Sequence, residues 1–401
     1  MDGVLGFAEA EAAPPARPPG WQLGLVGGCL FLLMLPVTAL VPVLNEMTVG
    51  RFPGLTDFEK HLFMTANMLG AALFAPVAGL ISDWMQRRKP LLVAAFAVNA
   101  ASLGLMLLDW SYPVQLGLRF VEGCAHIAAF SMLLTLGMDL SGKGDSGKAM
   151  GLLACCLTFG VAAGAPVGGF IGKENPLLIL AAGSLLMGAI APFSWAALRE
   201  NPIRQAPVGF RDLLATLGEH RLLWVPYVFI FLDRLTVGFI VSTMTLYLRT
   251  ELGAAPQRIG AIMALFMIPF ALLTYPAGRL SRRFNKLGMM IVGSLVYGVT
   301  FLVFPFATLG QISGLMFVSG MSAALMFAPS LVLVQLLAGD KHRAIAMSGF
   351  TTAGAIGFLL GPLFGGTLVS VSGYRGAFLA TGLLEVLCAL LFIGLLRRVR
   401  V

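Results

Sequence analysis

Charged residues are scarce in this sequence. Aspartate, glutamate, lysine and arginine together make up 11% of its 401 residues, whereas about 25% is usual in soluble domains. Histidine and cysteine are also rare, with four and five copies, and they show neither metal-ligand spacing nor the pattern of an extracellular disulfide framework. These shortages exclude an ordinary soluble domain and leave no motif for a metal enzyme.

Signatures of ATP-driven and catalytic proteins are missing as well. The chain contains no G-x-x-x-x-G-K-S/T, H-E-x-x-H or G-x-S-x-G sequence. We therefore expect no enzyme, no cofactor and no ATP-driven pump. The formal net charge is +8, but the basic residues are spread over short loops between apolar segments. For this reason we expect no nucleic-acid partner.

Long apolar runs dominate the chain. Hydrophobic residues make up 58% of it, and the mean hydropathy is +0.88. Runs of about 20 residues recur along the whole length, and each is long enough to cross a bilayer core of about 30 Å as a helix. The sequence predicts an all-α membrane protein with twelve transmembrane helices, at 22–46, 59–82, 90–109, 113–137, 148–172, 176–198, 223–249, 257–280, 286–306, 310–338, 344–370 and 374–396.

The predicted helices divide into two groups of six. The first half covers 22–198 and the second 223–396, with a polar linker at 199–222 and short tails at 1–21 and 397–401. Nineteen lysines and arginines fall on the side of both termini and six on the opposite side. The excess marks the cytoplasmic side, so we expect both termini in the cytoplasm. We also expect the protein to be a monomer in a bacterial inner membrane.

A stripe of glycines at every fourth position occurs twice. A stripe without side chains lets another helix approach closely, and a proline beside it kinks its own helix. The two stripes start 197 residues apart, about half of the chain, and we expect them to form a sliding contact between the two halves. They comprise Gly160, Gly164, Pro166 and Gly168 in the first half, and Gly357, Gly361, Pro362 and Gly365 in the second.

A second internal match follows the second predicted helix of each half. The loop at 78–89 reads A-G-L-I-S-D-W-M-Q-R-R-K, and the segment at 277–286 reads A-G-R-L-S-R-R-F-N-K, at an offset of 199 residues. Two matches at nearly the same offset indicate a parallel repeat of six plus six helices. Such internal repeats are typical of secondary transporters.

These motifs resemble those of the major facilitator superfamily, over essentially the whole chain. The first loop is similar to the family motif G-x-x-x-D-R/K-x-G-R-R/K, although Trp84 and Gln86 depart from it. The segment 160–169 resembles the helix-5 motif of the drug/proton antiporter branch. Residues 119–123 resemble the helix-4 motif R-x-x-Q-G, with a glutamate in place of the glutamine.

The resemblance implies a small-molecule substrate, transport by alternating access and a latch on the cytoplasmic side. The latch residues would be Gly79, Asp83, Arg87 and Arg88, with the two arginines pairing with Asp83. A carboxylate there is favoured near a helix N-terminus of the opposite half. In the second loop Arg282 replaces the acid, so no twin latch is expected.

Ionisable side chains inside predicted helices are costly and are therefore functional candidates. Arg119, Glu122 and His126 lie within about 60° on one face of the fourth helix. The family's helix-4 arginine is linked to proton transfer, so we expect these three residues to couple transport to protons. The alternative is a buried ion pair that fixes helix packing.

The seventh helix supplies a second pair of coupling candidates, Asp233 and Arg234. Adjacent residues point about 100° apart on a helix, so we expect them not to face the same point. Position 36, which is 197 residues earlier, holds Pro36, and our hypothesis is that Asp233 is the coupling acid, against a purely structural pair. Glu46 at the outer end of the first helix is a further candidate, with a solvated helix cap as the alternative.

Four more polar residues lie inside predicted helices and are candidates to line a substrate cavity. For the amides, hydrogen bonds between helices are the alternative. The last helix of each half usually packs on the outside, which argues against Glu385 as a cavity residue. The four are Asn67, Asn99, Gln335 and Glu385.

The predicted function is proton-coupled export of small amphiphilic or hydrophobic compounds by alternating access, with sodium as the alternative driving ion. A carrier of lysolipids, siderophores or metabolites on the same fold is a second hypothesis. A non-transporting membrane scaffold or assembly factor is a third.

Overall fold

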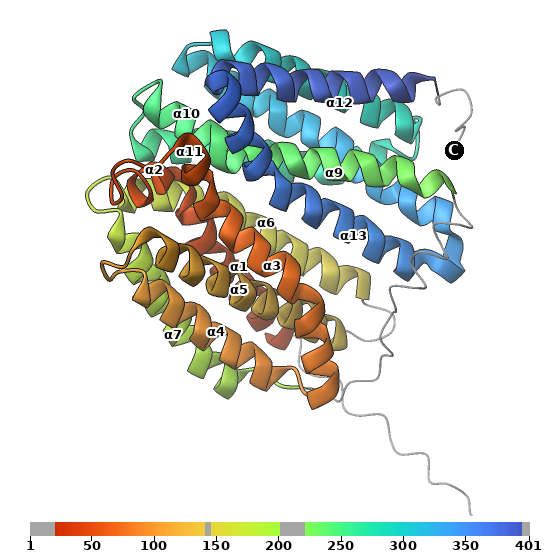
Figure 1. The fold of residues 1–401 in the computed structure, drawn as a ribbon. Helices are drawn as coiled ribbons and strands as arrows, with labels where there is room; N and C mark the ends of the chain where they lie inside the picture. Colours follow the sequence, from red (N-terminus) through yellow and green to blue (C-terminus); the bar gives the residue numbers. More distant parts are fainter. Residues whose placement is uncertain (1–20, 141–145, 201–220, 395–401) are drawn as a thin grey trace, which may run out of the picture.

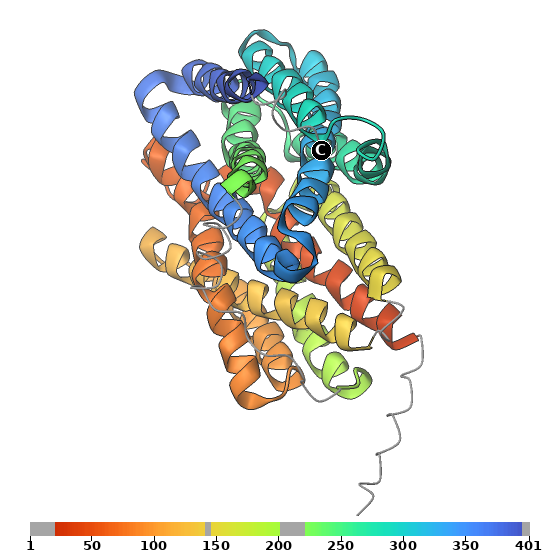
Figure 2. The same ribbon diagram turned by 90° about the vertical axis from the view of Figure 1, so that its right-hand side faces the viewer.

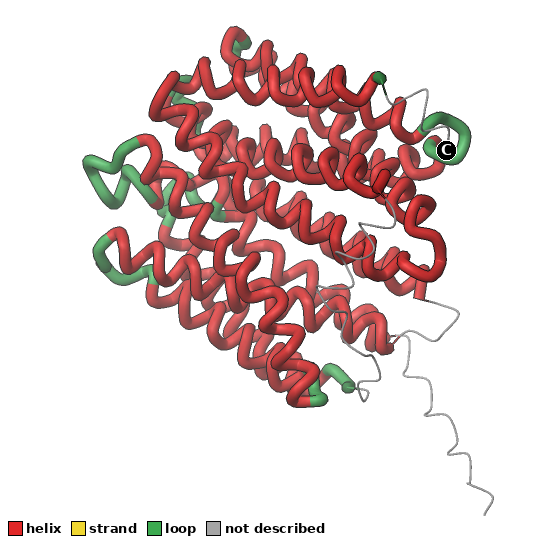
Figure 3. Tube along the Cα trace, turned by 45° about the vertical axis from the view of Figure 1, so that its right-hand side comes forward, coloured by secondary structure: helices red, strands yellow, loops and turns green. Residues whose placement is uncertain are grey.

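The computed structural model describes residues 21–140, 146–200 and 221–394, without the side chains of 83, 146–148, 221 and 339–344. Over these residues the chain forms helices and connecting loops and no strand (Figure 3). The predicted tails and most of the predicted linker lie outside the described residues. The division of the chain into domains therefore stays a prediction.

The helices of the first half agree with the predicted ones to within a few residues. Asp57–Met85 begins with two acids, which favour a helix N-terminus. The elements are α1 (Trp21–Ala39), η1 (Val41–Val43), α2 (Leu44–Met47), α3 (Asp57–Met85), α4 (Lys89–Leu105), α5 (Tyr112–Leu140), α6 (Ser146–Ile171) and α7 (Leu177–Ala197).

The first crossing of the second half widens into a π-helical turn, η3, after α9. A capping box of Thr308 and Gln311 starts the last helix. The elements are η2 (Arg221–Leu223), α9 (Trp224–Phe239), η3 (Ile240–Met244), α10 (Thr245–Thr250), α11 (Pro256–Leu280), α12 (Lys286–Val303), η4 (Phe304–Phe306) and α13 (Leu309–Ile393).

The described residues account for twelve membrane crossings. Ten helical segments are long and apolar enough to span a bilayer, and the shorter apolar helix Lys89–Leu105 adds one. The last segment, Ile345–Ile393, has 49 residues, enough for two crossings. Gly373, with φ +67°, divides these two. The last three predicted helices are thus parts of α13, which changes direction along its length (Figures 1 and 2).

The two halves lie against each other, the first from red to yellow-green and the second from green to blue in Figure 1. Contacts of α3 with α13 and of α6 with α11 join them. We call the end with the loops 48–56 and 251–255 the loop end. The opposite end, where α1 begins and α13 ends, is the terminal end (Figure 1).

The glycine stripes pack inside their own halves, so the predicted sliding contact between halves is wrong. A Cβ built on Gly160 would lie 2.5 Å from the carbonyl oxygen of Phe31 in α1, and one on Gly357 would collide with the carbonyl of Phe231 in α9. The rest of both stripes meets the same two crossings: Gly164 and Gly168 meet Thr38 and Ala39, while Gly361 and Gly365 meet Gly238 and Thr243.

Residues next to the stripes make the contact between halves instead. Gly169, one residue beyond the first stripe, meets the backbone of Pro256 in α11. Gly260 on α11 meets the backbone carbonyl of Ala165, which precedes the predicted kink at Pro166. One face of α6 therefore packs against α1 within the first half, and the adjacent face packs against α11 of the second half.

A further internal match confirms the repeat. Residues 119–123 read R-F-V-E-G, and 316–320 read M-F-V-S-G, at an offset of 197. Gly123 lies directly against the carbonyl of Asn67 in α3, and Gly320 lies against that of Phe266 in α11. The two halves thus share a backbone contact as well as a motif.

Candidate functional site

The first half buries an ion pair within α5, on the face that packs against α3. Arg119 Nη1 lies 2.7 Å from Glu122 Oε2, and the two side chains are 0% and 1% exposed. The guanidinium stands over the Phe63 ring at 4.8 Å, and its Nε donates to the Phe63 carbonyl at 3.4 Å. The charge of the arginine is therefore matched by a carboxylate, a ring and a carbonyl.

Two amides complete the surroundings of Glu122. Asn67 on α3 donates to Oε2 and Asn99 on α4 donates to Oε1 at 3.3 Å. Both amides are buried and make hydrogen bonds between helices, which was the alternative interpretation. Their role in lining a substrate cavity stays a prediction. The close approach of Gly123 to the Asn67 backbone brings this donor within reach.

Two other candidates are less tightly held. His126, one turn beyond Glu122 on α5, is half-buried, and its described interactions are electrostatic ones with Glu122 and Arg119. Gln335 on α13 is half-buried. Their roles stay predictions.

The second half places Asp233 and Arg234 in contact, contrary to the expectation from their helical angles. Arg234 Nε lies 3.4 Å from Asp233 Oδ2 because the long arginine side chain reaches back along α9. The guanidinium also stands 4.8 Å from the Phe327 ring and 5.5 Å from the Phe270 ring. Asp233 is 1% exposed, and neither of its carboxylate oxygens accepts a hydrogen bond within the described structure.

Glu385 on the last crossing is buried inside the second half, where it contacts α9 and α12. It is 1% exposed and contacts the hydroxyls of Thr236 at 2.7 Å and Ser294 at 2.6 Å. Its role as a cavity residue stays a prediction. Tyr297 on α12 is fully buried, and its hydroxyl has no hydrogen-bond partner in the described part of the chain. This hydroxyl interacts electrostatically with both Asp233 and Glu385.

The two groups differ in charge. Arg119 and Glu122 sum to zero, whereas Asp233, Glu385 and Arg234 sum to one negative charge when both acids are ionised. Within the described residues, Arg234 is the cation that interacts with this second group. The second group can therefore take up one positive charge and the first cannot.

The side-chain polar contacts between halves that the described residues show lie at the loop end. Arg249 Nε lies 2.7 Å from Glu46 Oε1, so Glu46 is part of an ion pair between halves, and its role in coupling stays a prediction. His61 Nε2 lies 3.0 Å from Thr243 Oγ1, while its Nδ1 donates to the Asp57 carbonyl at 2.7 Å. Sequence reasoning missed His61, since nothing near it resembles a motif.

At the terminal end, Arg88 belongs to a pair that sequence reasoning missed. Its Nε lies 2.6 Å from Asp139 Oδ2, at the end of α5 in the same half. Glu200 accepts hydrogen bonds from the backbone nitrogens of Arg88 and Lys89, where α4 begins, as expected for an acid at a helix N-terminus. Listing the acids that fall at this end would have found both partners.

The predicted latch is therefore only partly described. Arg88 pairs with Asp139. The side chain of Asp83 lies outside the described residues, so the pairing of Arg87 and Arg88 with Asp83 stays a prediction. Arg87 is exposed, and Gly79 has open space where a side chain would begin.

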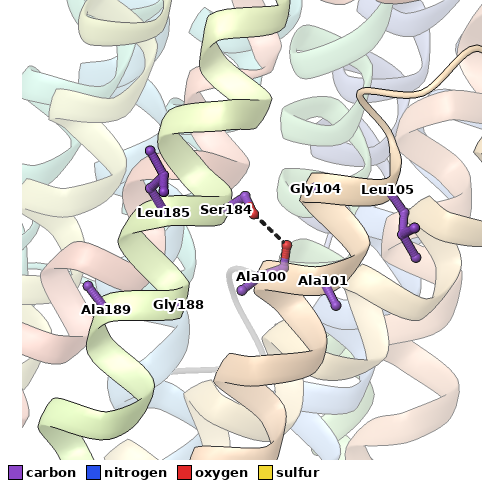
Figure 4. Close-up of a pocket in the computed structure, with 8 residues that line it drawn as sticks. All are labelled: Ala100, Ala101, Gly104, Leu105, Ser184, Leu185, Gly188 and Ala189. Carbon is purple, nitrogen blue, oxygen red and sulfur yellow. Dashed lines mark hydrogen bonds between the residues drawn. The ribbon is translucent and has the colours of Figure 1, made fainter.

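A groove of about 720 Å³ runs between α4 and α7 on the side of the first half (Figure 4). The Ser184 hydroxyl donates to the Ala100 carbonyl at 2.8 Å across it. Its walls are mostly small or apolar, and none of the charged groups above lines it. The groove is thus separate from both charge clusters.

Two six-helix halves with charged groups buried in each define a secondary transporter of the membrane. The chain belongs to the Major Facilitator Superfamily, whose family profile matches residues 26–234 and 227–401. It is an integral membrane protein and a transporter rather than an enzyme.

Similar proteins support this assignment. The synaptic vesicular amine transporter of Mus musculus is 24% identical over 347 residues, covering 83% of this chain and 65% of that protein. The vesicular acetylcholine transporter of Rattus norvegicus is 27% identical over 374 residues, with 86% and 68% covered. The chain thus spans just under two thirds of the mouse relative's length.

Among solved structures, a bacterial homologue of the human lysosomal transporter Spinster superposes with a TM-score of 0.80 at 14% identity. The superposition covers 94% of this chain and 96% of that one. This likeness shows the fold alone.

Proposed function

We propose that the protein exchanges protons for small amphiphilic molecules by alternating access, and that it works as an exporter. The observation that supports this most directly is an excess of one acid in the second half: the described side chains there include two buried carboxylates, Asp233 and Glu385, and one arginine beside them, Arg234. An uncompensated charge inside a membrane protein is costly. One proton bound to this group removes the cost.

The buried negative charge also suits a cationic cargo. The similar proteins are named for amines and acetylcholine, and a small organic cation would compete with the proton for the same charge. Phe270 and Phe327 beside Arg234 supply apolar surface for the rest of such a molecule. Mutual exclusion of proton and cargo is the thermodynamic basis of exchange.

The arrangement of contacts favours alternating access. His61 with Thr243 and Glu46 with Arg249 hold the halves together at the loop end. The described ion pair at the terminal end, Arg88 with Asp139, lies within one half. Opening at the terminal end therefore leaves that pair intact, while opening at the loop end requires both inter-half contacts to break. With the termini in the cytoplasm, the open side would be cytoplasmic.

The test is proton flux in liposomes that contain the purified protein and a trapped pH indicator. Tetraphenylphosphonium, acetylcholine and lysophosphatidylcholine are added in turn, with and without a sodium gradient. We expect a cation to drive proton movement, and Asp233→Asn to abolish it because Arg234 and Glu385 then balance each other. Glu174→Gln, the same acid-to-amide change at an exposed loop position, is the matched control and should transport normally.

Other outcomes select the other hypotheses. Flux driven only by lysophosphatidylcholine would identify a lipid carrier, and flux that follows the sodium gradient would identify sodium coupling. Folded protein that moves none of the three compounds, and behaves like Asp233→Asn, would contradict the proposal and favour the scaffold.

A further inference from the structure

Glu385 is held by two hydroxyl groups from two other helices. Its Oε1 lies 2.7 Å from Thr236 Oγ1 on α9, and its Oε2 lies 2.6 Å from Ser294 Oγ on α12. All three residues are at most 1% exposed. This carboxyl group is therefore in fixed contact with hydroxyls and sealed from solvent.

The hydroxyl hydrogens are too few for the acceptors around them. Thr236 Oγ1 also lies 2.9 Å from the Leu232 carbonyl, and Ser294 Oγ lies 3.1 Å from the backbone carbonyl of Glu385. Each hydroxyl has one hydrogen to donate. Two hydrogens thus face four acceptors: two carbonyls and the two oxygens of the carboxyl group.

A hydrogen on the carboxyl group resolves this shortage. If Thr236 donates to the Leu232 carbonyl, as helical threonines commonly do, its oxygen becomes an acceptor for a Glu385 O–H. Ser294 can then donate to the other carboxyl oxygen at 2.6 Å. Each short contact of the carboxyl group then has one donor and one acceptor.

The charges around Glu385 lead to the same assignment. Glu122, equally buried, has an arginine at 2.7 Å and two amide donors. The described charged neighbour of Glu385 is another acid, Asp233, and Arg234 is already paired with that acid. An ionised Glu385 would therefore be a buried carboxylate without a cation, which a proton on it avoids.

We infer that Glu385 carries the exchangeable proton as a neutral carboxylic acid. This rests on the proposed proton coupling and names the group that holds the proton. The contacts with Thr236 and Ser294 hold the acid in place on two other helices.

The proton balance needs no further reactant. On release, the O–H bond of Glu385 breaks and Glu385 becomes a carboxylate; on uptake, the same bond forms again.

The experiment is infrared difference spectroscopy of the full-length protein after a pH jump, with no cargo required. We expect a carbonyl band of a protonated carboxyl group that shifts in heavy water, disappears at high pH and is absent in Glu385→Gln. Glu46→Gln is the matched control, because that acid is ion-paired at the loop end, and should retain the band. Thr236→Val should shift the band without removing it, since the acid loses its acceptor.

Transport by the same variants separates the two proposals. Glutamine can donate to Thr236 and accept from Ser294, so Glu385→Gln should fold, exchange cargo down its own gradient, and lose proton-driven accumulation. If Glu385→Gln remains fully proton-coupled and keeps the carbonyl band of the protonated acid, the assignment of Glu385 is overturned while the proposed function stands. If the wild type moves cargo without protons the proposed function fails, and a band that ignores pH would then overturn the assignment too.

Discussion

Glu122 in the first half and Glu385 in the second are each 1% exposed, yet their surroundings have little in common. The first has an arginine and two amides as partners, so every formal charge near it is cancelled. The second has two hydroxyls and a neighbouring acid. Equal burial therefore does not mean equal function: a cancelled charge favours rigidity, and an uncancelled one favours exchange with protons.

The largest expected effect is on the stability of the first half. Glu122→Gln leaves Arg119 charged and unpaired, and breaking a buried pair costs about 3–5 kcal/mol. Thermal unfolding in detergent should show this loss for Glu122→Gln and almost none for Glu385→Gln. Replacing Arg119 and Glu122 together by methionine should restore most of the stability. Equal losses for the two glutamine variants would break the comparison.

The next effect concerns the loops at the terminal end. Arg88 is buried and paired with Asp139, whereas Arg283 in the corresponding loop of the second half is exposed. Arg88→Ala removes the charge-assisted hydrogen bond between Arg88 and the partly buried Asp139, so we expect a loss of about 1.5–3 kcal/mol. Arg283→Ala is the control and should stay within about 0.5 kcal/mol of wild type. Denaturation in detergent measures both, and indistinguishable results would be contrary to this difference.

A third test compares the two glycines of the shared motif. A methyl group at Gly123 or at Gly320 collides with a backbone carbonyl of the neighbouring helix, and such overpacking typically costs about 1–3 kcal/mol. We expect Gly123→Ala to lose more stability, because the displaced helix also carries the Asn67 donor to Glu122. The reverse order in unfolding experiments would show that backbone contact alone decides the cost.

The smallest effect is expected at the loop end. The pair of Glu46 and Arg249 is partly exposed, and such pairs contribute about 0.2–1 kcal/mol. Arg249→Ala should hardly change unfolding, yet it should widen the distribution of distances between spin labels placed on the two halves at this end. Lys173→Ala, which changes an exposed loop lysine, is the control. An unchanged distribution in Arg249→Ala would argue against this pair as a contact that holds the halves together.

The fold could be predicted almost completely from the sequence, because each crossing is a long apolar run and the repeat is visible in two motifs. The roles of the buried polar residues were harder to predict. The partners of Asn67 and Asn99 could not be assigned until the position of Glu122 was known. The position of Glu385 on the last helix argued against a role inside the protein. Its carboxyl group nevertheless contacts hydroxyls of α9 and α12 in the interior of the second half.

Two other expectations failed for geometric reasons. Helical angles separate Asp233 from Arg234 at the backbone, but the arginine side chain is long enough to return to its neighbour. The glycine stripes indicate that a helix approaches closely without identifying that helix, and the partner proved to be in the same half. The spacing of residues predicts which face of a helix packs closely. Only the three-dimensional arrangement shows which helix packs against that face.

The matching segments 119–123 and 316–320 bear on the ancestry of the chain. They keep the same glycine-to-carbonyl contact, while the first carries arginine and glutamate where the second carries Met316 and Ser319. After duplication, the steric frame was inherited by both copies and the ionisable residues diverged. Such a scaffold can change its coupling chemistry by a few substitutions in one copy, while the other copy preserves the fold.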